Sequence, residues 1–201
     1  MKAVAFDAYG TLFDVFSVTA LGDELFPGKG DALAQLWRLT EDALTYAVTS
    51  LGLDLTPDKR ARLLEAYLTL SAFPDVKPGL EALKRRGLRL AILSNGEPKM
   101  LEAAARSAGI VDLLDAILSV EEVKIFKPSP RVYHLAPEHL RVRPSELGFV
   151  SSNCWDVAGA ASVGLETFWI QRRAAEPAEE LGFTADHTVS TITDLAPLLR
   201  G

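Results

Sequence analysis

The sequence contains a single cysteine, Cys154, among its 201 residues. One thiol cannot form a disulfide within the chain, so nothing indicates an oxidising compartment, and we expect Cys154 to be a small buried residue. Also missing is any run of about 18 apolar residues, the length that a membrane-spanning helix needs. The first apolar stretch ends at Asp7 and is too short for the core of a signal peptide. These absences predict a cytoplasmic protein with no membrane partner.

Basic residues are also fewer than acidic ones. Lys and Arg number 21 against 27 Asp and Glu, which gives a formal net charge of −6 at pH 7. Because nucleic-acid-binding domains typically carry an excess of basic residues, this composition argues against a nucleic-acid partner. Hydrophobic residues make up 48% and charged residues 24% of the sequence, the balance of an ordinary globular domain.

Short apolar runs alternate with helical patterns along the chain. Each run is partly β-branched or aromatic and is bounded by turn formers, which is typical of buried parallel strands. The predicted strands are Ala3–Phe6, Leu88–Leu93, Ala116–Leu118, Leu147–Val150 and Thr167–Ile170, with a weaker sixth at Thr188–Ser190. The predicted later helices are Pro78–Arg86, Lys99–Ala108 and one that begins at Pro130. The alternation predicts an α/β fold, with a parallel-sheet, Rossmann-like core and helices on both faces.

The segment between the first two predicted strands differs from the other connections. From Val15 to Pro74 the sequence has helical stretches but no strand-like run. The helical stretches lie around Ala32–Leu39, Glu41–Leu51 and Asp58–Leu70. A block of this length is too long for one crossover connection. We therefore predict a core domain formed by residues 1–14 and 75–201, and an inserted helical cap domain formed by residues 15–74.

Polar side chains follow the predicted strands at the points where the strands end. Asp7 follows the first strand, Ser94-Asn95-Gly96 the second, and Ser151-Ser152-Asn153, with Asp156, the fourth, while Lys127 lies in the connection after the third. Ligands of open parallel sheets bind at the carboxyl ends of the strands, so we expect one shared crevice. Taken singly, each residue has a simpler explanation, such as a turn, a helix cap or a solvated charge. Their coincidence at one edge favours a functional site.

In order, and over almost the whole chain, these residues resemble the four motifs of the haloacid dehalogenase superfamily. The resembling stretches are Phe6-Asp7-Ala8-Tyr9-Gly10-Thr11-Leu12, Ile92-Leu93-Ser94-Asn95-Gly96, Lys127-Pro128 and Val150-Ser151-Ser152-Asn153-Cys154-Trp155-Asp156. The resemblance implies that Asp7 is a covalent nucleophile and that Lys127 lies beside it.

Two departures from the phosphatases of that superfamily bear on the chemistry. Phosphatases usually have a second Asp two residues after the nucleophile, which protonates the leaving alkoxide, and a Gly-Asp pair in the fourth motif, which helps to bind magnesium. Here the corresponding positions hold Tyr9 and Ser151-Ser152. Magnesium prefers anionic oxygen ligands, and a halide, unlike an alkoxide, leaves without a proton. Both departures favour carbon–halogen cleavage with no metal or organic cofactor.

Two alternatives stay open at this point. One is a magnesium-dependent small-molecule phosphatase of the same superfamily, against which Tyr9 and Ser152 argue. The other is a non-catalytic ligand-binding protein on the same scaffold. The intact set of Asp7, Lys127, Asn153 and Asp156 argues against the second, since a scaffold without activity does not need it.

The sequence is similar in particular to the L-2-haloacid dehalogenase subfamily. The similar stretches are Asp7–Val15, Leu36-Trp37-Arg38, Lys127 with Arg131-Val132-Tyr133, and Phe149–Asp156. The similarity implies hydrolysis of a small (S)-2-haloacid to an (R)-2-hydroxyacid and a halide ion through an ester on Asp7. It also implies a homodimer.

The same similarity implies a role for each site residue. Asp7, ionised at neutral pH, attacks carbon 2, while Lys127 supplies the positive charge that replaces a metal. Arg38 faces the departing halide. The remaining catalytic residues, which position and activate water, are Asn153, Asp156 and Ser151, and the choice between Lys127 and Asp156 as the base stays open. The substrate-binding residues are Tyr9, Thr11, Ser94, Asn95, Tyr133 and Trp155.

The resemblance breaks directly after Arg38. In the subfamily a longer stretch precedes a segment like Thr40-Glu41-Asp42-Ala43-Leu44, which here follows almost at once. Either the cap is truncated at this point, or a segment is missing between Arg38 and Leu39. We favour the second, because the residues on both sides match closely. A separation of the two Cα atoms well beyond the ~3.8 Å of a trans peptide would indicate it.

Overall fold

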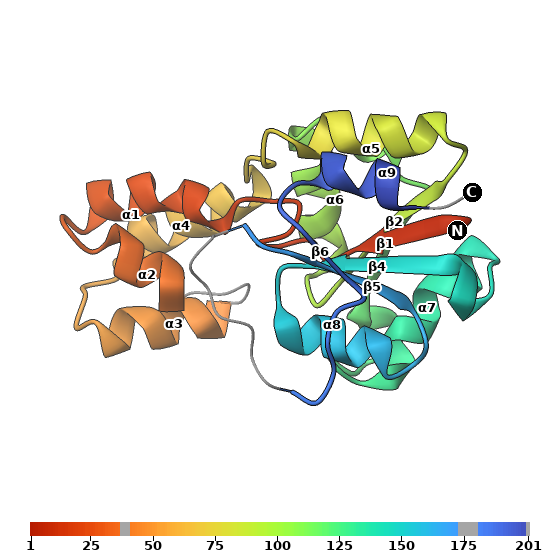
Figure 1. Ribbon diagram of the computed structural model, residues 1–201. Helices are drawn as coiled ribbons and strands as arrows, with labels where there is room; N and C mark the ends of the chain where they lie inside the picture. Colours follow the sequence, from red (N-terminus) through yellow and green to blue (C-terminus); the bar gives the residue numbers. More distant parts are fainter. Residues whose placement is uncertain (37–40, 173–180, 200–201) are drawn as a thin grey trace.

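The computed structural model describes residues 1–36, 41–172 and 181–199 (Figure 1). The predicted site residue Arg38 and its junction with Leu39 lie outside these described residues. The choice between a truncated cap and a missing segment therefore stays open.

Six strands form one sheet in which every neighbouring pair is parallel, in the order β3-β2-β1-β4-β5-β6. The strands are β1 (Ala3–Phe6), β2 (Arg89–Ser94), β3 (Ala116–Ser119), β4 (Leu147–Ser151), β5 (Glu166–Ile170) and β6 (His187–Val189). The predicted α/β fold with a parallel Rossmann-like sheet is confirmed. Each predicted strand, including the weak sixth, lies within about one residue of an observed one.

The strands read as continuous apolar runs because both faces of the sheet are covered. In β1, Val4 and Phe6 belong to one apolar cluster, whereas Ala3 and Ala5 belong to another. Side chains alternate across a strand, so these two clusters lie on opposite faces of the sheet. A strand that is buried on both sides shows no polar alternation.

Helices cover both faces of the sheet (Figure 1). One face carries α5 (Val76–Arg85), α6 (Pro98–Ser107) and α9 (Leu195–Leu198), and the other carries α7 (Pro130–Leu140) and α8 (Cys154–Ala161). Short 3-10 helices complete the connections: η1 (Val15–Val18), η2 (Val111–Leu113), η3 (Val120–Glu122), η4 (Pro144–Glu146) and η5 (Ile192–Asp194). After α5 the chain turns at Gly87, whose φ of +78° is a conformation that glycine adopts at little cost.

A helical block follows β1 and lies beside the sheet (Figure 1). It contains η1, α1 (Thr19–Leu25), α2 (Gly30–Leu36), α3 (Glu41–Ser50) and α4 (Pro57–Leu68). The last three correspond to the predicted stretches, but α1 was not predicted, because it is short and contains Gly22. That glycine lets α1 approach α2 closely: a Cβ on Gly22 would lie 2.9 Å from the Cα of Gly30.

The two segments that connect the block to the core run side by side. The amide of Asp14 donates to the carbonyl of Ser71 at 2.8 Å, and the amide of Phe73 donates to the carbonyl of Leu12 at 3.0 Å. The chain thus leaves and re-enters the core next to Asp7, so the block lies directly beside the strand ends.

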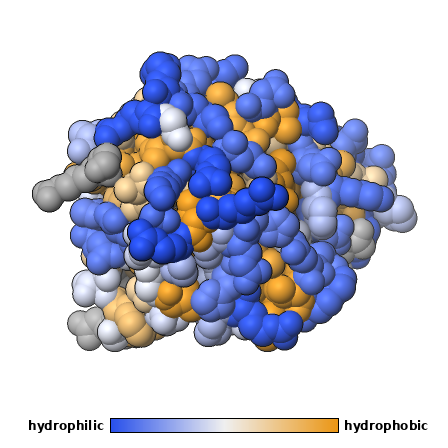
Figure 2. Space-filling view, turned by 90° about the vertical axis from the view of Figure 1, so that its right-hand side faces the viewer, coloured by the Kyte–Doolittle hydropathy of each residue, from blue (hydrophilic) through white to orange (hydrophobic). Residues whose placement is uncertain are grey.

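The face of the molecule near the chain termini mixes hydrophilic residues with smaller hydrophobic areas (Figure 2). Within the described ranges, no helix combines the length and apolar character needed to cross a membrane.

Leu80 tests how the sheet is covered, because its side chain lies fully buried between α5 and the strands. We expect Leu80→Ala to lower the free energy of unfolding by about 2–5 kcal/mol, since it removes buried methyl groups and leaves a cavity. Urea unfolding followed by circular dichroism measures the change. Leu198→Ala, at a position that is 37% exposed, is the control and should cost far less. Equal losses would contradict the proposed packing.

Candidate active site

The carboxyl ends of β1, β2 and β4 bring polar residues from distant parts of the chain together. The chain order places β1 between β2 and β4, and successive strands spread outward from this centre in both directions. Crevices for ligands form at such switch points. Asp7 follows β1, Ser94 ends β2, and Ser151 ends β4. The predicted convergence at one edge therefore occurs.

A buried lysine between two carboxylates forms the centre of this site. Lys127 Nζ lies 3.1 Å from Asp7 Oδ1 and 2.9 Å from Asp156 Oδ2. The side chains of Lys127 and Asp156 are 1% and 0% exposed, and that of Asp7 is 11% exposed. Buried charges are costly unless they are paired, and here one ammonium pairs with two carboxylates. Asp7 is the member of the three that reaches open space.

The pKa values of this group follow from burial and mutual charge. Burial raises the pKa of Asp7 above its ordinary value, Lys127 opposes that rise, and Asp156 adds to it. Burial lowers the pKa of Lys127, but the two neighbouring carboxylates outweigh it, so its pKa lies above the ordinary value. The lysine is therefore held as a cation.

The backbone before Lys127 is fixed by the loop after β2. The amide of Lys127 donates to Asn95 Oδ1 at 2.9 Å, and Nζ lies 5.0 Å from the centre of the Phe149 ring. Asn95 thus joins the loop after β2 to the connection after β3 through its side-chain oxygen, which leaves its amide NH2 group as a donor.

Tyr133 holds Asp156 from the opposite side. Its hydroxyl donates to Asp156 Oδ1 at 2.7 Å, so both oxygens of Asp156 have buried partners. Burial and Asp156 raise the pKa of Tyr133, which keeps the phenol protonated as a donor. Gly159 makes room for this ring, since a Cβ there would lie 2.8 Å from two ring carbons of Tyr133.

The second oxygen of Asp7 has weaker contacts. Thr11 Oγ1 lies 3.3 Å from Asp7 Oδ2, and Asn153 Nδ2 lies 3.4 Å from the same oxygen. Thr11 Oγ1 also accepts from the amide of Ser152 at 2.9 Å, which links the loops after β1 and β4. The hydroxyls of Ser94 and Ser151 accept backbone amides within their own loops, from Gly96 at 3.1 Å and Asn153 at 3.2 Å.

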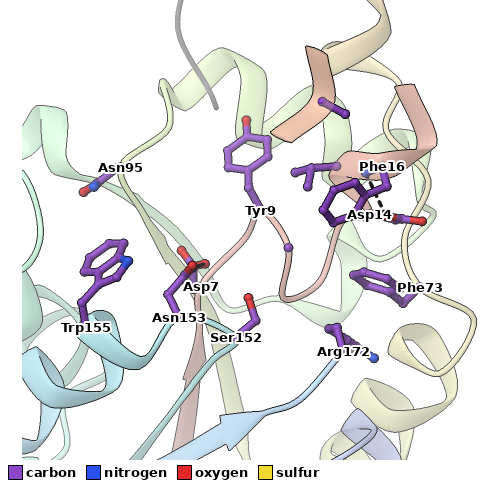
Figure 3. A pocket seen from close by; sticks show the side chains of 13 residues that line it. Asp7, Tyr9, Asp14, Phe16, Phe73, Asn95, Ser152, Asn153, Trp155 and Arg172 are labelled. Carbon is purple, nitrogen blue, oxygen red and sulfur yellow. Dashed lines mark hydrogen bonds between the residues drawn. The ribbon is translucent and has the colours of Figure 1, made fainter. Parts of the chain in front are cut away.

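A cavity of about 360 Å³ opens above Asp7 (Figure 3). Its lining is Asp7, Tyr9, Gly10, Asp14, Val15, Phe16, Ala34, Phe73, Asn95, Ser152, Asn153, Trp155 and Arg172. Among the predicted site residues, five therefore reach the cavity: Asp7, Tyr9, Asn95, Asn153 and Trp155. The others that the structure describes lie behind this lining: Thr11, Ser94, Lys127, Tyr133, Ser151 and Asp156.

Eight of the lining residues were not predicted as site residues, and two of these, Ser152 and Arg172, bond to Thr11. Ser152 was noted among the polar residues after the fourth predicted strand and as a departure from the phosphatase pattern, whereas Arg172 was not considered. Arg172 donates to the carbonyl of Thr11 from Nε at 3.1 Å and from a terminal nitrogen at 2.6 Å, and it pairs with Asp75 at 2.7 Å. It follows the end of β5 by two residues, so the strand-end rule that identified Asp7 could have found it.

A metal site is not suggested by the part of the chain that the structure describes. That part holds no group of three or more His, Cys, Asp or Glu side chains placed to bind an ion. Between Asp7 and Asp156, the position where two carboxylates would share a cation is taken by the Lys127 ammonium.

Comparison with known proteins defines the class. The family model of haloacid dehalogenase-like hydrolases matches residues 1–164, most of the chain. The chain belongs to the haloacid dehalogenase superfamily.

Its relatives narrow the class further. An (S)-2-haloacid dehalogenase of Pseudomonas sp. (strain YL) is 43% identical, in an alignment that covers 100% of this chain and 95% of that protein. A solved L-2-haloacid dehalogenase, 43% identical, superposes with a TM-score of 0.93 over 98% of each chain. The Xanthobacter autotrophicus L-2-haloacid dehalogenase with covalently bound chloropropionic acid is 34% identical, with a TM-score of 0.91 over 100% of this chain and 99% of that one. Within the superfamily, the resemblance to the L-2-haloacid dehalogenases is confirmed.

The alignment with the enzyme of Pseudomonas sp. (strain YL) is longer than this chain. It runs over 221 residues, whereas this chain has 201, so part of that relative has no counterpart here.

Gly159 offers a test of the buried network. A methyl group at this position must push the Tyr133 ring away from Asp156, so we expect Gly159→Ala to destabilise the protein by about 1–3 kcal/mol. This loss would run against the helix propensity of alanine, which by itself would stabilise α8. Urea unfolding of Gly159→Ala, Tyr133→Phe and the double variant measures the coupling between the two positions. Additive effects on the free energy of unfolding would show that the contact between position 159 and Tyr133 does not contribute to stability.

Proposed function

We propose that this protein hydrolyses small (S)-2-haloacids to (R)-2-hydroxyacids and halide, through an ester on Asp7 and without a metal. The observation that carries the proposal is the Asp7 carboxylate at the floor of a cavity, paired from behind with a buried lysine. A carboxylate held in this way is available as a nucleophile towards a carbon atom. The relatives of this protein that are named (S)-2-haloacid dehalogenases support the same reaction.

In the first half of the reaction, Asp7 Oδ2 attacks carbon 2 and the halide leaves with the bonding electron pair. Oδ2 is the freer oxygen, because its contacts of 3.3 and 3.4 Å are longer than the 3.1 Å pairing of Oδ1 with Lys127. The amide NH2 of Asn95 and the ring of Trp155, both in the cavity lining, would surround the departing halide. Arg38, outside the described residues, stays the predicted cation for that halide.

In the second half, water attacks the side-chain carbonyl carbon of the Asp7 ester. Negative charge then develops on Oδ1, where the Lys127 ammonium already lies, and preorganised charge of this kind lowers the barrier. The bond from that carbon to Oδ2 breaks, and Oδ2 leaves as the hydroxyl oxygen of the product. Asn153 lies in the lining beside Asp7, where it would position the water, while Asp156 and Lys127 form the route for its protons.

Halide release tests the proposal directly. The protein is incubated with (S)-2-chloropropionate in excess chelator, and chloride is measured over time. We expect the same turnover with chelator and with added magnesium, because Lys127 supplies the local positive charge. A lack of chloride release would overturn the proposal. Strong stimulation by magnesium, together with cleavage of phosphate esters, would favour a phosphatase instead.

Asp7→Asn should abolish chloride release, because an amide is a poor nucleophile at carbon. We expect a loss of at least about 10³-fold in kcat, with the fold retained by circular dichroism. Asp112→Asn, at an exposed position in η2 that does not line the cavity, is the control. Near wild-type turnover by freshly purified Asp7→Asn, shown by mass spectrometry to contain no deamidated residue, would remove the central claim.

The pH profile tests the charge relations at the site. Asp7 must be ionised to attack, so kcat/KM should fall as the pH drops through a pKa above the ordinary aspartate value. Lys127→Gln removes the charge that opposes this rise, so the acid limb should move to higher pH, and kcat should drop by about 10²–10³-fold. Lys124→Gln, at an exposed lysine of the same loop, is the control. An unmoved acid limb in Lys127→Gln would contradict the electrostatic role of Lys127.

We also propose the predicted division into a core domain (residues 1–14 and 75–201) and a cap domain (residues 15–74), together with a homodimer formed through cap helices. Leu36 on α2 and Tyr46 on α3 support the dimer, being large apolar side chains that are 39% and 65% exposed. Sedimentation velocity tests it: Tyr46→Glu should shift the protein towards monomer, whereas Phe183→Glu, at another exposed aromatic residue, should not.

A further inference from the structure

Arg172 is a buried cation that the reaction described above does not use. Its side chain is 10% exposed and that of its partner Asp75 is 16% exposed, with 2.7 Å between Arg172 Nη1 and Asp75 Oδ1. Burying a charged pair is costly, and apolar residues in its place often stabilise a protein as well or better. Stability alone therefore does not account for this pair, and the loop that Arg172 contacts indicates a different role.

The guanidinium of Arg172 holds the loop that follows the nucleophile. Its Nε and Nη2 atoms both donate to the carbonyl of Thr11, at 3.1 and 2.6 Å. Thr11 is fully buried, so its carbonyl depends on a donor from the protein. The carbonyls of Ala8 and Leu12 in the same loop accept backbone amides, whereas that of Thr11 accepts from a side chain that lies far along the chain.

The guanidinium is itself fixed from several directions. The amide of Gln171 donates to β6 at 2.9 Å, which extends the sheet to the residue before Arg172. The ring of Phe73 lies beside the guanidinium, with its centre 4.1 Å from Cζ (Figure 3). Asp75 accepts from Arg172 with one oxygen and from the amide of Ile192 with the other, at 2.6 Å. The guanidinium is therefore a fixed point between the edge of the sheet and the loop.

The side chain of Thr11 connects this fixed point to the nucleophile. Its hydroxyl oxygen accepts the amide of Ser152 at 2.9 Å, and its hydrogen has two possible acceptors at 3.3 Å, Asp7 Oδ2 and Ser152 Oγ. Hydrogen bonds to an ionised acceptor are the stronger ones, so the carboxylate is the favoured partner. Oδ2 is also the oxygen assigned above to the attack on carbon 2.

We propose that Arg172 is a positioning residue for the nucleophile: it fixes the carbonyl of Thr11, so that the Thr11 hydroxyl keeps Asp7 Oδ2 oriented for the attack. This inference rests on the function proposed above. Arg172 acts through Thr11, and the role needs no contact between its guanidinium and the substrate. An arginine suits this role because its planar fork donates to one carbonyl from two nitrogens while the third nitrogen faces Asp75.

Arg172→Gln tests the proposal, with kcat/KM for chloride release from (S)-2-chloropropionate as the measurement. This constant depends only on the steps up to the departure of the halide, which include the attack by Oδ2. We expect it to fall by about 10²-fold, the loss that a misplacement of about 1 Å can cause. Arg86→Gln is the matched control and should keep the wild-type value. Arg86 also donates from two nitrogens to backbone carbonyls, those of Ala196 and Leu199, but it lies outside the cavity lining.

The pH profile of kcat/KM separates positioning from a general loss of structure. The Thr11 hydroxyl favours the ionised form of Asp7, so losing this hydrogen bond raises the pKa of the carboxyl. In Arg172→Gln the acid limb should therefore move to higher pH, although Lys127 and Asp156, the charged groups that face Asp7, are unchanged. In Arg86→Gln the acid limb should stay in place.

Two further variants show how Arg172 acts. Thr11→Val keeps the branched shape of the side chain but removes the hydroxyl, so in this background Arg172→Gln should lower kcat/KM little further. Arg172→Lys keeps the positive charge opposite Asp75 but lacks the planar fork, so it should also lower kcat/KM and move the acid limb to higher pH. It takes the place of Arg172→Gln if circular dichroism shows that the glutamine variant does not fold.

The outcomes separate this inference from the function on which it rests. If the wild type releases no chloride, the dehalogenase proposal fails and this inference fails with it. If the wild type is active, a wild-type kcat/KM or an unmoved acid limb in a folded Arg172 variant would overturn the positioning role alone. Additive losses in Thr11→Val and Arg172→Gln would overturn it as well, because Arg172 would then act independently of the Thr11 hydroxyl.

Discussion

The Lys127 ammonium, buried between Asp7 and Asp156, is the interaction on which the rest of the site depends. One cation that faces two carboxylates leaves one net negative charge at the sheet edge, and only Asp7 carries it to open space. Such a group is tolerated only because every member has further partners, such as Tyr133 on Asp156 and Thr11 on Asp7. The site therefore requires that the ends of β1 and β4 and the connection after β3 meet at one point. This requirement constrains the arrangement of strands in the whole sheet.

Much of this arrangement follows from local sequence patterns. Asp7, Ser94 and Ser151 were predictable because each ends or follows a continuous apolar strand, and parallel strands end at one edge. The position of Lys127 after the third predicted strand indicated the same edge, but its place beside Asp7 needed the resemblance to a known family. Local sequence patterns do not predict contacts between residues that lie far apart along the chain. Arg172 follows a strand end and could have been placed at this edge, but its bond to Thr11, 161 positions away, leaves no periodic signal. The same holds for the bond from the Ser152 amide to Thr11, 141 positions away.

The same limit applies to which side chains face the cavity. Thr11, Ser94 and Tyr133 were predicted to bind substrate, yet the structure places them behind the lining, where they hold loops and carboxylates. The helix α1 was missed for a related reason. Its glycine lowers helix propensity, and the gain that offsets it, the close approach of Gly22 to Gly30, is a tertiary contact. Strand ends are local features, but the direction of a side chain at a strand end is not.

Arg172 also constrains how the molecule could move. It donates to the carbonyl of Thr11 on the segment that leaves the core, and it pairs with Asp75 on the segment that returns. Asp75 in turn accepts a hydrogen bond from the amide of Ile192 in η5. A swing of the helical block would have to pivot beyond these bonds, in the paired segments around Asp14 and Ser71. The loop that carries the nucleophile would then stay still while the walls of the cavity part, so substrate could enter and product could leave without any reassembly of the reactive centre.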